Sequence, residues 1–307
     1  MEIKDLTFKK VEAQDIKRMS EFYGLRPNRT CDSVVLESYL WKDYCNVRFA
    51  VAEDRALLWL MELNGEEYSA MPACKEEDLP RYFQMTEEYF NQVLNKPLVI
   101  GLADEEAVRF LNLDESRYEI REDEDLKDYL YDGAALRALS GKKLRKKKNH
   151  INGFMREYEG RYEYRPLVCC DRSDVWAFLD VWRENKGDET EEHLDYEVAG
   201  LHEVLKDCGY FHVSMAGVYI DGKLEAFTMG SYNPLEDMAV IHIEKANPEI
   251  RGLYQFINQQ FLLHAYPEVK LVNREDDLGI EGLRKAKLSY EPIGYARKYA
   301  IRQKRRD

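Results

Sequence analysis

The spacing of apolar residues divides the chain into two successive halves with a similar order of elements. In the first half, alternation predicts strands and a period near 3.6 predicts helices. The expected elements are strands at 47–51 and 57–61, a helix over 76–94, a strand at 97–102 and a helix over 104–111. Asp104 precedes the last of these helices and is expected to cap it.

The second half begins with an expected strand at 162–168 and two helices, separated by a polar break at 185–190. Asp221-Gly222 then predicts a hairpin of 212–220 and 223–230. The remaining expected elements are a strand at 239–246, a helix over 251–264, a strand at 269–273, a helix over 278–288 and a strand at 293–302. This order predicts an α+β layer fold with a mixed central sheet.

Charge is distributed unevenly along the 307 residues. Residues 1–132 carry 17 basic and 30 acidic side chains, whereas 133–307 carry 28 of each, so the net charge of −13 belongs to the first part. The second part contains a basic run of six cations in seven positions: Lys142, Lys143, Arg145, Lys146, Lys147 and Lys148. The run predicts one local anion-binding place, for which the acidic first part, a nucleic acid and an anionic lipid surface are the candidates. The alternative is a solvated helix face.

Composition excludes several protein classes. Hydrophobic residues make up 45% and aromatic residues 12% of the chain, as expected of a packed globular protein. No run of about 18 apolar residues predicts a membrane-spanning helix, and the charged first 15 residues do not have the pattern of a signal peptide. The six cysteines form no CxxC pair and are expected to be reduced thiols of a cytoplasmic protein.

Five motifs in the second half resemble a known family. They lie at 141–154, 242–246, 251–255, 273–279 and 282–290. Together they resemble the DUF2156 family, whose members look like the C-terminal domain of phosphatidylglycerol lysyltransferases. The resemblance covers nearly the whole chain from about Asp32.

The resemblance implies a tandem pair of acyl-CoA N-acyltransferase-like (GNAT-like) domains, each a mixed, mostly antiparallel sheet flanked by helices. On this basis residues 1–132 are expected to form an acidic N-terminal domain, 133–158 a basic linking helix, and 159–307 the domain with the active site. Related aminoacyl transferases move an aminoacyl group from charged tRNA to an amine or hydroxyl. In GNAT enzymes the donor is acetyl-CoA.

His242 and Glu244 are the first candidates for chemistry. Alternation along a strand predicts that they share one face, opposite Ile241 and Ile243. An imidazole and a carboxylate side by side can take a proton from an attacking amine. The alternative is that both residues hydrogen-bond to neighbouring elements and only fix the sheet.

Arg251-Gly252 lies between an expected strand and an expected helix. Glycine allows close approach of a ligand, and a helix N-terminus attracts anions. In the GNAT fold this turn holds the donor's pyrophosphate, so the resemblance implies a donor-binding turn here. A plain helix start with a solvated arginine is the alternative.

Asn273 and Arg274 end the next strand, where they are candidates for holding a donor carbonyl or phosphate. Asp276 and Asp277 are expected to cap the helix that begins at Leu278. No spacing with histidine accompanies these carboxylates, so no metal is predicted. Tyr290 follows the helix, and GNAT enzymes often place a proton-donating tyrosine there; packing is its alternative role.

These features predict an acyl or aminoacyl transferase. Glu244 is the candidate base, with His242 beside it, and Tyr290 is the candidate acid. Aminoacyl-tRNA is the preferred donor and acyl-CoA the second, with no tightly bound cofactor. The expected partners are tRNA at the basic run and an anionic membrane surface, contacted peripherally. Alternatives are an acetyl-CoA-dependent N-acetyltransferase and a non-catalytic module that binds tRNA or another anion.

Overall fold

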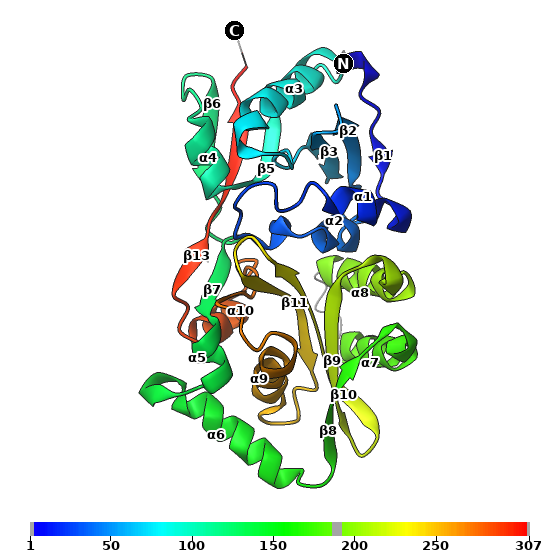
Figure 1. The fold of residues 1–307 in the computed structure, drawn as a ribbon, viewed down its shortest axis with the longest axis vertical. Coiled ribbons are helices and arrows are strands. Elements are labelled where there is room, and N and C mark those ends of the chain that lie inside the picture. The colour runs from blue at the N-terminus through cyan, green and yellow to red at the C-terminus, as the bar shows by residue number, and fades with distance from the viewer. Residues whose placement is uncertain (1–2, 186–191, 306–307) are drawn as a thin grey trace. The chain divides into compact units, whose positions relative to one another are not determined.

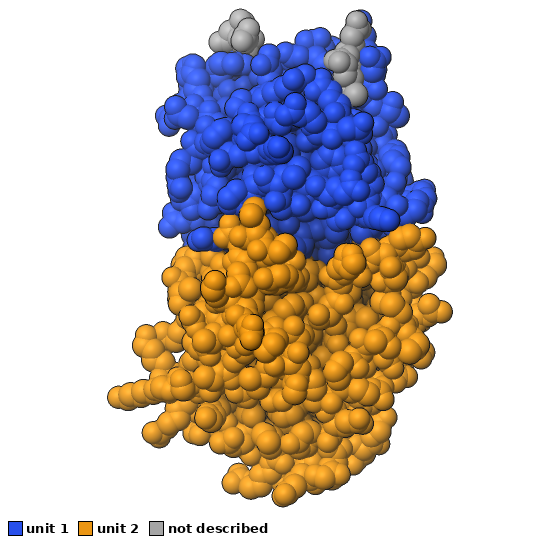
Figure 2. Space-filling view, viewed as in Figure 1, with its two compact units in different colours: residues 1–128, 296–307 blue, residues 129–295 orange. Residues whose placement is uncertain are grey.

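The computed structural model describes residues 3–185 and 192–305 (Figure 1). The chain forms two compact units, coloured separately in Figure 2. Unit 1 comprises residues 1–128 and 296–307, and unit 2 comprises residues 129–295. The polar break expected at 185–190 lies outside the described residues except for Asn185.

Unit 1 contains two sheets, with strand orders β1-β2-β3-β4 and β5-β14-β6. The strands of the first sheet are β1 (Lys9–Lys10), β2 (Arg48–Ala52), β3 (Ala56–Leu63) and β4 (Glu66–Tyr68). Those of the second are β5 (Val99–Asp104), β6 (Tyr118–Glu122) and β14 (Lys298–Gln303). The strand β14 pairs antiparallel with both β5 and β6, so the end of the chain returns to complete unit 1.

Among the described residues of unit 1, four α-helices accompany these sheets: α1 (Ile16–Ser20), α2 (Leu36–Leu40), α3 (Leu79–Gln92) and α4 (Glu105–Leu111). The helix α3 buries Leu79, Tyr82, Phe83 and Phe90. Of the four aromatic residues expected to form its apolar stripe, Tyr82, Phe83 and Phe90 are buried and Tyr89 is partly exposed. Asp104 caps α4 by accepting a hydrogen bond from the backbone N–H of Ala107 at 2.9 Å, which confirms the predicted cap.

Unit 2 is built on a seven-stranded sheet with the order β13-β7-β12-β11-β10-β9-β8. The strands are β7 (Asp128–Asp132), β8 (Tyr162–Leu167), β9 (Val213–Ile220), β10 (Lys223–Asn233), β11 (Met238–Ala246), β12 (Leu271–Asn273) and β13 (Gly294–Ala296). The pair β11–β12 is parallel, whereas β8–β9, β9–β10, β10–β11 and β12–β7 are antiparallel. The mixed sheet and the hairpin confirm the sequence prediction.

Helices lie on both sides of this sheet (Figure 1). They are α5 (Gly133–Ala138), α6 (Gly141–Glu157), α7 (Arg172–Glu184), α8 (Glu192–Lys206), α9 (Leu253–Ala265) and α10 (Glu281–Leu288). The helices α5, α6 and α9 pack together, and α7 packs on α8. In Figure 1, α9 and the α7–α8 pair lie on either side of strands β9–β11.

The segment 133–158, expected as one linking helix, contains two helices. Leu139 ends α5 in the left-handed conformation with φ 43°, and Gly141 follows with φ 87°. Glycine adopts such angles readily, so the chain changes direction here before α6 begins. The basic run therefore lies on a separate helix within unit 2.

The expectation of six reduced thiols is wrong for two cysteines. Cys169 and Cys208 form a disulfide with Cα atoms 5.6 Å apart. Cys169 begins η5 (Cys169–Asp171) before α7, and Cys208 begins η6 (Cys208–Tyr210) after α8. The two helices pack on each other and bring these ends together, although 39 positions separate the residues.

Across residues 3–185 and 192–305, no helix combines the length and the apolar character that crossing a membrane requires.

Candidate active site

The strands β11 and β12 separate at the edge where the predicted site residues lie. Their parallel pairing runs from Met238 opposite Leu271 to Val240 opposite Asn273. There β12 ends, whereas β11 continues to Ala246 along β10. Beyond this point the two strands are no longer paired, and the next residues of β11 lie beside the turn that follows β12, as the contact between Glu244 and Arg274 shows.

A β-bulge in β11 changes which residues share a face. Met229 of β10 lies opposite Ile243 but Gly230 lies opposite Ile241, so His242 is the extra residue. Glu244 accepts a hydrogen bond from Asn258 of α9, whereas the neighbouring Lys245 pairs with Glu197 of α8. The inserted residue shifts the alternation, and the prediction that His242 and Glu244 share a face is wrong.

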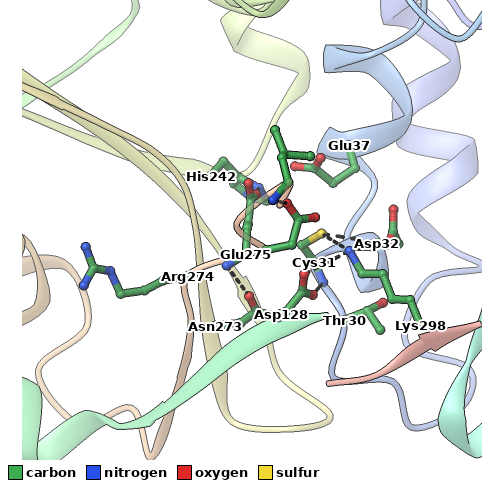
Figure 3. A network of polar contacts seen from close by, with 12 residues as sticks. Thr30, Cys31, Asp32, Glu37, Asp128, His242, Asn273, Arg274, Glu275 and Lys298 are labelled. Carbon is green, nitrogen blue, oxygen red and sulfur yellow. Dashed lines mark hydrogen bonds and ion pairs between the residues drawn. The ribbon is translucent and has the colours of Figure 1, made fainter. Parts of the chain in front are cut away.

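His242 is held on the other side of the sheet from Glu244. Its Nδ1 lies 2.9 Å from Oε1 of Glu275 (Figure 3). Its Nε2 lies 3.0 Å from Oγ of Ser231. The side chain of Arg274 points away from His242 and Glu275 in the same view. With both ring nitrogens engaged, the geometry favours the alternative in which His242 fixes the sheet.

Glu244 and Arg274 form an ion pair just beyond the point where β11 and β12 cease to pair. Arg274 Nη2 lies 2.9 Å from Glu244 Oε1, and Asn258 Nδ2 donates to Glu244 Oε2 at 2.6 Å. The two side chains are 11% and 13% exposed. Burial lowers the pKa of Arg274, but Glu244, Tyr131 and Tyr290 together outweigh this effect and raise the pKa, so the guanidinium stays charged. Because both carboxylate oxygens are engaged, Glu244 is placed to orient Arg274.

Tyr290 covers the guanidinium of Arg274. The Arg274 Cζ lies 4.6 Å from the centroid of the Tyr290 ring, a distance typical of a cation–π contact. Tyr290 is buried, and this burial raises the pKa of its phenol although Arg274 acts in the opposite direction. A phenol in this state keeps its proton and can donate it. The predicted acid and the predicted donor-binding arginine are thus in contact.

One lysine of the basic run, Lys147, contacts Tyr290. Lys147 Nζ lies 4.0 Å from the centroid of Tyr290 and donates to Ser289 Oγ at 2.6 Å. Burial lowers the pKa of Lys147 to about 8, and the cations Arg274 and Lys146 act in the same direction. Lys147 is half-buried, so α6 contributes a side chain to the candidate site.

The other residues of the run are directed differently. Lys143 pairs with Glu291 at 2.6 Å, within unit 2. Lys142, Arg145, Lys146 and Lys148 are exposed, and no ion pair is recorded for them among the residues that the structure describes. These four side chains form an exposed basic face of α6 next to Lys147.

The predicted donor-binding turn packs against α6. Gly252 has φ 90°, and a Cβ added there would lie 2.3 Å from the backbone O of His150 and 3.1 Å from Cβ of Phe154. The glycine is therefore required by the chain's own helix as well as by its left-handed backbone. Burial lowers the pKa of His150, and the cations Arg251 and Lys146 reinforce this shift. Arg251 thus lies beside the basic run.

The turn between β12 and α10 is more extensively bonded than expected. The helix α10 begins at Glu281, not at Leu278, and Asp277 is buried before it. Asp277 accepts hydrogen bonds from Arg284, from Tyr129 and from the backbone of Gly279, so the predicted capping role is wrong for this residue. Its charged and phenolic partners come from α10 and β7, which sequence spacing does not reveal.

Three further contacts hold this turn. Asn273 is fully buried and accepts a hydrogen bond from the backbone N–H of Glu275 at 2.6 Å (Figure 3). Asp276 accepts one from the backbone of Leu278 at 3.3 Å. Lys287 Nζ donates to the carbonyl oxygens of Arg274 and Asp276. These bonds fix the backbone from which Arg274 projects.

Asn258, Lys287 and Tyr131 were not predicted as site residues. Tyr131, on β7, has its ring 5.7 Å from Arg274 Cζ. Burial raises the pKa of Tyr131, and Arg274 counteracts this. An amide inside the apolar helix 251–264 was a signal for Asn258, because a buried amide needs a polar partner.

A pocket of about 520 Å³ lies elsewhere in unit 2, between α7 and the β9–β10 hairpin. Its apolar lining includes Phe178, Val181, Trp182 and Leu224. Neither Glu244 nor Arg274 is among its lining residues, so this pocket is separate from the cluster around Tyr290.

Unit 1 holds a buried charge cluster that the sequence did not reveal. Lys298 Nζ lies 2.9 Å from Asp128 Oδ1, 3.3 Å from Asp32 Oδ2 and 3.1 Å from the sulfur of Cys31 (Figure 3). Lys298 is 2% exposed and Asp128 is fully buried. Burial raises the pKa of Asp32, and Lys298 opposes this shift. These side chains come from positions up to 267 residues apart, which no local pattern relates.

Similar structures are known over nearly the whole chain. A conserved protein of unknown function from Bacteroides thetaiotaomicron is 27% identical with a TM-score of 0.89, covering 97% of this chain and 100% of that one. L-PGS from Bacillus licheniformis is 15% identical with a TM-score of 0.67, covering 95% and 92%. FemX is 7% identical with a TM-score of 0.64, covering 96% of each chain. The last two likenesses concern the fold alone, which is α+β.

Among curated proteins, an uncharacterised protein of Mycoplasmoides gallisepticum is 26% identical over 175 residues, or 57% of this chain. The chain spans 56% of that relative's length. The family model described as phosphatidylglycerol lysyltransferase, C-terminal, matches residues 23–302. That match covers most of the chain and confirms the resemblance inferred from the motifs, so the chain belongs to the phosphatidylglycerol lysyltransferase C-terminal family.

Proposed function

We propose that this protein is an aminoacyltransferase that moves an aminoacyl group from aminoacyl-tRNA to an amine or hydroxyl acceptor, of which a lipid or a peptide is an example. The observation that carries the proposal is the meeting of three predicted features in unit 2. The basic helix α6 contacts the Arg251-Gly252 turn, and its Lys147 contacts Tyr290 beside Arg274. A polyanionic donor bound along α6 would bring its acyl end toward Tyr290 and Arg274, beyond the end of β12.

The residues have distinct roles in this proposal. The exposed cations of α6 attract the RNA backbone without reading its sequence. Arg274, oriented by Glu244, holds the donor near its reacting ester. In the reaction the ester bond to the ribose oxygen breaks, the acceptor forms the new acyl bond and loses a proton, and the ribose oxygen gains one. Tyr290, whose phenol is protonated, is placed to donate that proton.

The tandem arrangement predicted from the resemblance belongs to the same proposal. We assign unit 1, which contains most of the acidic residues 1–132, to an N-terminal GNAT-like domain, and unit 2, which contains 133–158 and most of 159–307, to the GNAT-like domain with the active site. His242 remains in the site as a residue that fixes β11, with its two ring nitrogens bonded to Glu275 and Ser231. The protein would act in the cytoplasm, where charged tRNA is present, and contact anionic membranes peripherally.

An acetyl-CoA-dependent N-acetyltransferase is the second candidate for the same fold. The Arg251-Gly252 turn favours it, because a helix N-terminus follows a cationic side chain there. The only glycine of that turn, however, already accommodates the backbone of His150. The turn therefore offers less room for a pyrophosphate than a glycine-rich loop, and aminoacyl-tRNA is the donor that we favour.

The test measures transfer of a labelled aminoacyl group by the full chain. Radiolabelled lysyl-tRNA and a mixture of other aminoacyl-tRNAs would be incubated with phosphatidylglycerol vesicles and, separately, with an amine acceptor. The proposal expects labelled product with wild type and a large loss in Arg274→Gln. Consumption of acetyl-CoA without aminoacyl transfer would select the second candidate, and tRNA binding without any turnover would indicate a non-catalytic module.

A further inference from the structure

Two cations share one aromatic ring at the centre of the candidate site. Lys147 Nζ and Arg274 Cζ lie 4.0 Å and 4.6 Å from the centroid of Tyr290. They come from α6 and from the end of β12, elements separated by more than 100 residues. Two like charges this close repel each other. Accordingly, Arg274 is one of the causes that lower the pKa of Lys147. A cluster of this kind is stabilised when an anion binds.

The carboxylate nearby does not balance this charge. Glu244 is the acidic side chain that influences both cations, and it already pairs with Arg274 Nη2. Arg274 Nη1 is buried and has no hydrogen-bond partner among the described residues. A buried guanidinium donor without a partner costs free energy, so the site is incomplete as it stands. An anion that accepts from Nη1 would satisfy it.

We propose that Lys147, Arg274 and Tyr290 form a phosphate-binding subsite that takes a phosphate group of a nucleotide-bearing donor. This assignment rests on the proposed function and makes it more specific. Arginine supplies a planar set of donors that matches phosphate oxygens, and lysine supplies a point charge. Ser289, which accepts from Lys147 at 2.6 Å, holds the ammonium group beside the ring.

The phosphate has two possible sources with the same chemistry. One is the phosphodiester next to the 3′-terminal adenosine of a charged tRNA, and the other is the phosphate of coenzyme A. The subsite lies beside the exposed cations of α6, which would continue along an RNA backbone but have no counterpart ligand in coenzyme A. Competition experiments distinguish the two sources.

The experiment measures binding of adenosine 5′-monophosphate to the full chain by calorimetry at constant ionic strength, with adenosine as the probe without phosphate. Lys147→Gln is expected to weaken binding of the monophosphate about tenfold, which is the effect of losing one charge-assisted hydrogen bond. Binding of adenosine should not change. Arg156→Gln is the matched control, since Arg156 is an exposed cation near the other end of the same helix and outside the basic run, and it should change affinity less than twofold.

A pH series adds a second readout. Below pH 8 the ammonium group of Lys147 is charged and attracts phosphate, and above its pKa of about 8 the group becomes neutral. Affinity should therefore fall between pH 7 and pH 9.5 in wild type and stay flat in Lys147→Gln, whereas Lys147→Arg should keep its affinity throughout. The charged or titratable groups near Lys147 are Lys146 and His150 of α6, Glu244 of β11, and Arg274 and Tyr290.

The outcomes separate this inference from the proposed function. Unchanged monophosphate affinity in Lys147→Gln, at an unchanged melting temperature, would overturn the subsite even if aminoacyl transfer is observed. Loss of affinity in the variant of a protein that transfers no aminoacyl group would support the subsite and reject the function. Displacement of the monophosphate by a CCA trinucleotide identifies tRNA as the source, and displacement by coenzyme A identifies the alternative.

Discussion

Lys298 in unit 1 and Arg274 in unit 2 each belong to a buried ion-pair cluster, and these two clusters differ in the balance of their charges. In unit 1, Lys298 faces the carboxylates of Asp128 and Asp32, and the ammonium is almost completely enclosed. In unit 2, Arg274 has Glu244 as its carboxylate partner, while the second cation, Lys147, remains half-buried. The first cluster joins distant segments of the chain. The second leaves a positive charge and a guanidinium donor for another molecule.

This difference separates a structural cluster from a binding cluster. Buried charges persist when their partners compensate the loss of water, as Asp128 does for Lys298. Sites that bind ligands often retain uncompensated groups, at a cost in stability. The comparison predicts that disrupting unit 1 mainly changes folding, whereas changing Lys147 mainly changes binding.

The largest effect is expected from Lys298→Met. The substitution keeps the side-chain length but leaves Asp128 buried without its ammonium partner, and losing one member of a buried pair typically costs about 3–5 kcal/mol. Urea unfolding of the full chain measures the loss. Arg302→Met is the control: it removes an exposed pair with Glu66 and should cost less than about 1 kcal/mol.

A double variant makes that prediction sharper. Asp128→Asn introduced together with Lys298→Met removes the uncompensated charge but keeps an oxygen that can accept from the backbone N–H of Cys31. Stability should partly recover relative to Lys298→Met alone. If Lys298→Met and Asp128→Asn, each introduced alone, are as stable as wild type, the unit 1 cluster does not stabilise the fold.

Glu244→Gln is the next largest test, because it changes the unit 2 cluster without changing its shape. Glutamine can still bond to Asn258, but Arg274 loses its counter-charge, so a loss of about 1–3 kcal/mol is expected. Turnover should fall together with the melting temperature if Glu244 orients Arg274. A fall of about 10²–10⁴-fold in turnover at an unchanged melting temperature would instead identify Glu244 as the general base.

Much of the fold could be predicted from the sequence because its signals are local. The hairpin at Asp221-Gly222 and the cap at Asp104 are short-range features, and both were confirmed. Which residues of β11 share a face could not be predicted, since a bulge adds one residue to the strand without any signal in the composition. That single insertion at His242 moved Glu244 to the side of α9.

The candidate site was predictable as a set of residue types but not as an arrangement. Arg274, Tyr290 and the basic run were each identified separately, and only the fold places Lys147 on the ring of Tyr290. The Cys169–Cys208 pair was missed for the same reason: the packing of α7 on α8 joins them. Contacts between residues far apart in the chain depend on tertiary structure, which spacing does not encode.

The exposed cations of α6 give a prediction for tRNA binding. Replacing Lys142, Arg145 and Lys146 with Gln should reduce the slope of log affinity against log salt by about two to three, since each lost phosphate contact contributes just under one. Filter binding at several salt concentrations measures the slope. The matched control is the replacement of three exposed lysines of unit 1, Lys10, Lys17 and Lys75, which should leave the slope unchanged. Equal slopes for the two triple variants would show that tRNA does not bind along α6.

The smallest effect concerns the stability of Lys147→Gln in the absence of ligand. The folded-state pKa of Lys147 is about 8, below its ordinary value of 10.5. Between these values the unfolded chain binds a proton that the folded chain has released, so this lysine makes stability rise with pH over that window and destabilises the fold below it. Removing Lys147 should therefore raise the free energy of unfolding at pH 7, by no more than about 1 kcal/mol because solvent screens a half-buried charge. The gain should vanish near pH 10.5, and Lys148→Gln should show no such dependence in parallel urea titrations. If Lys147→Gln is instead less stable than wild type at pH 7, Lys147 stabilises the fold by packing. The excess positive charge of the unit 2 cluster would then not be explained by anion binding.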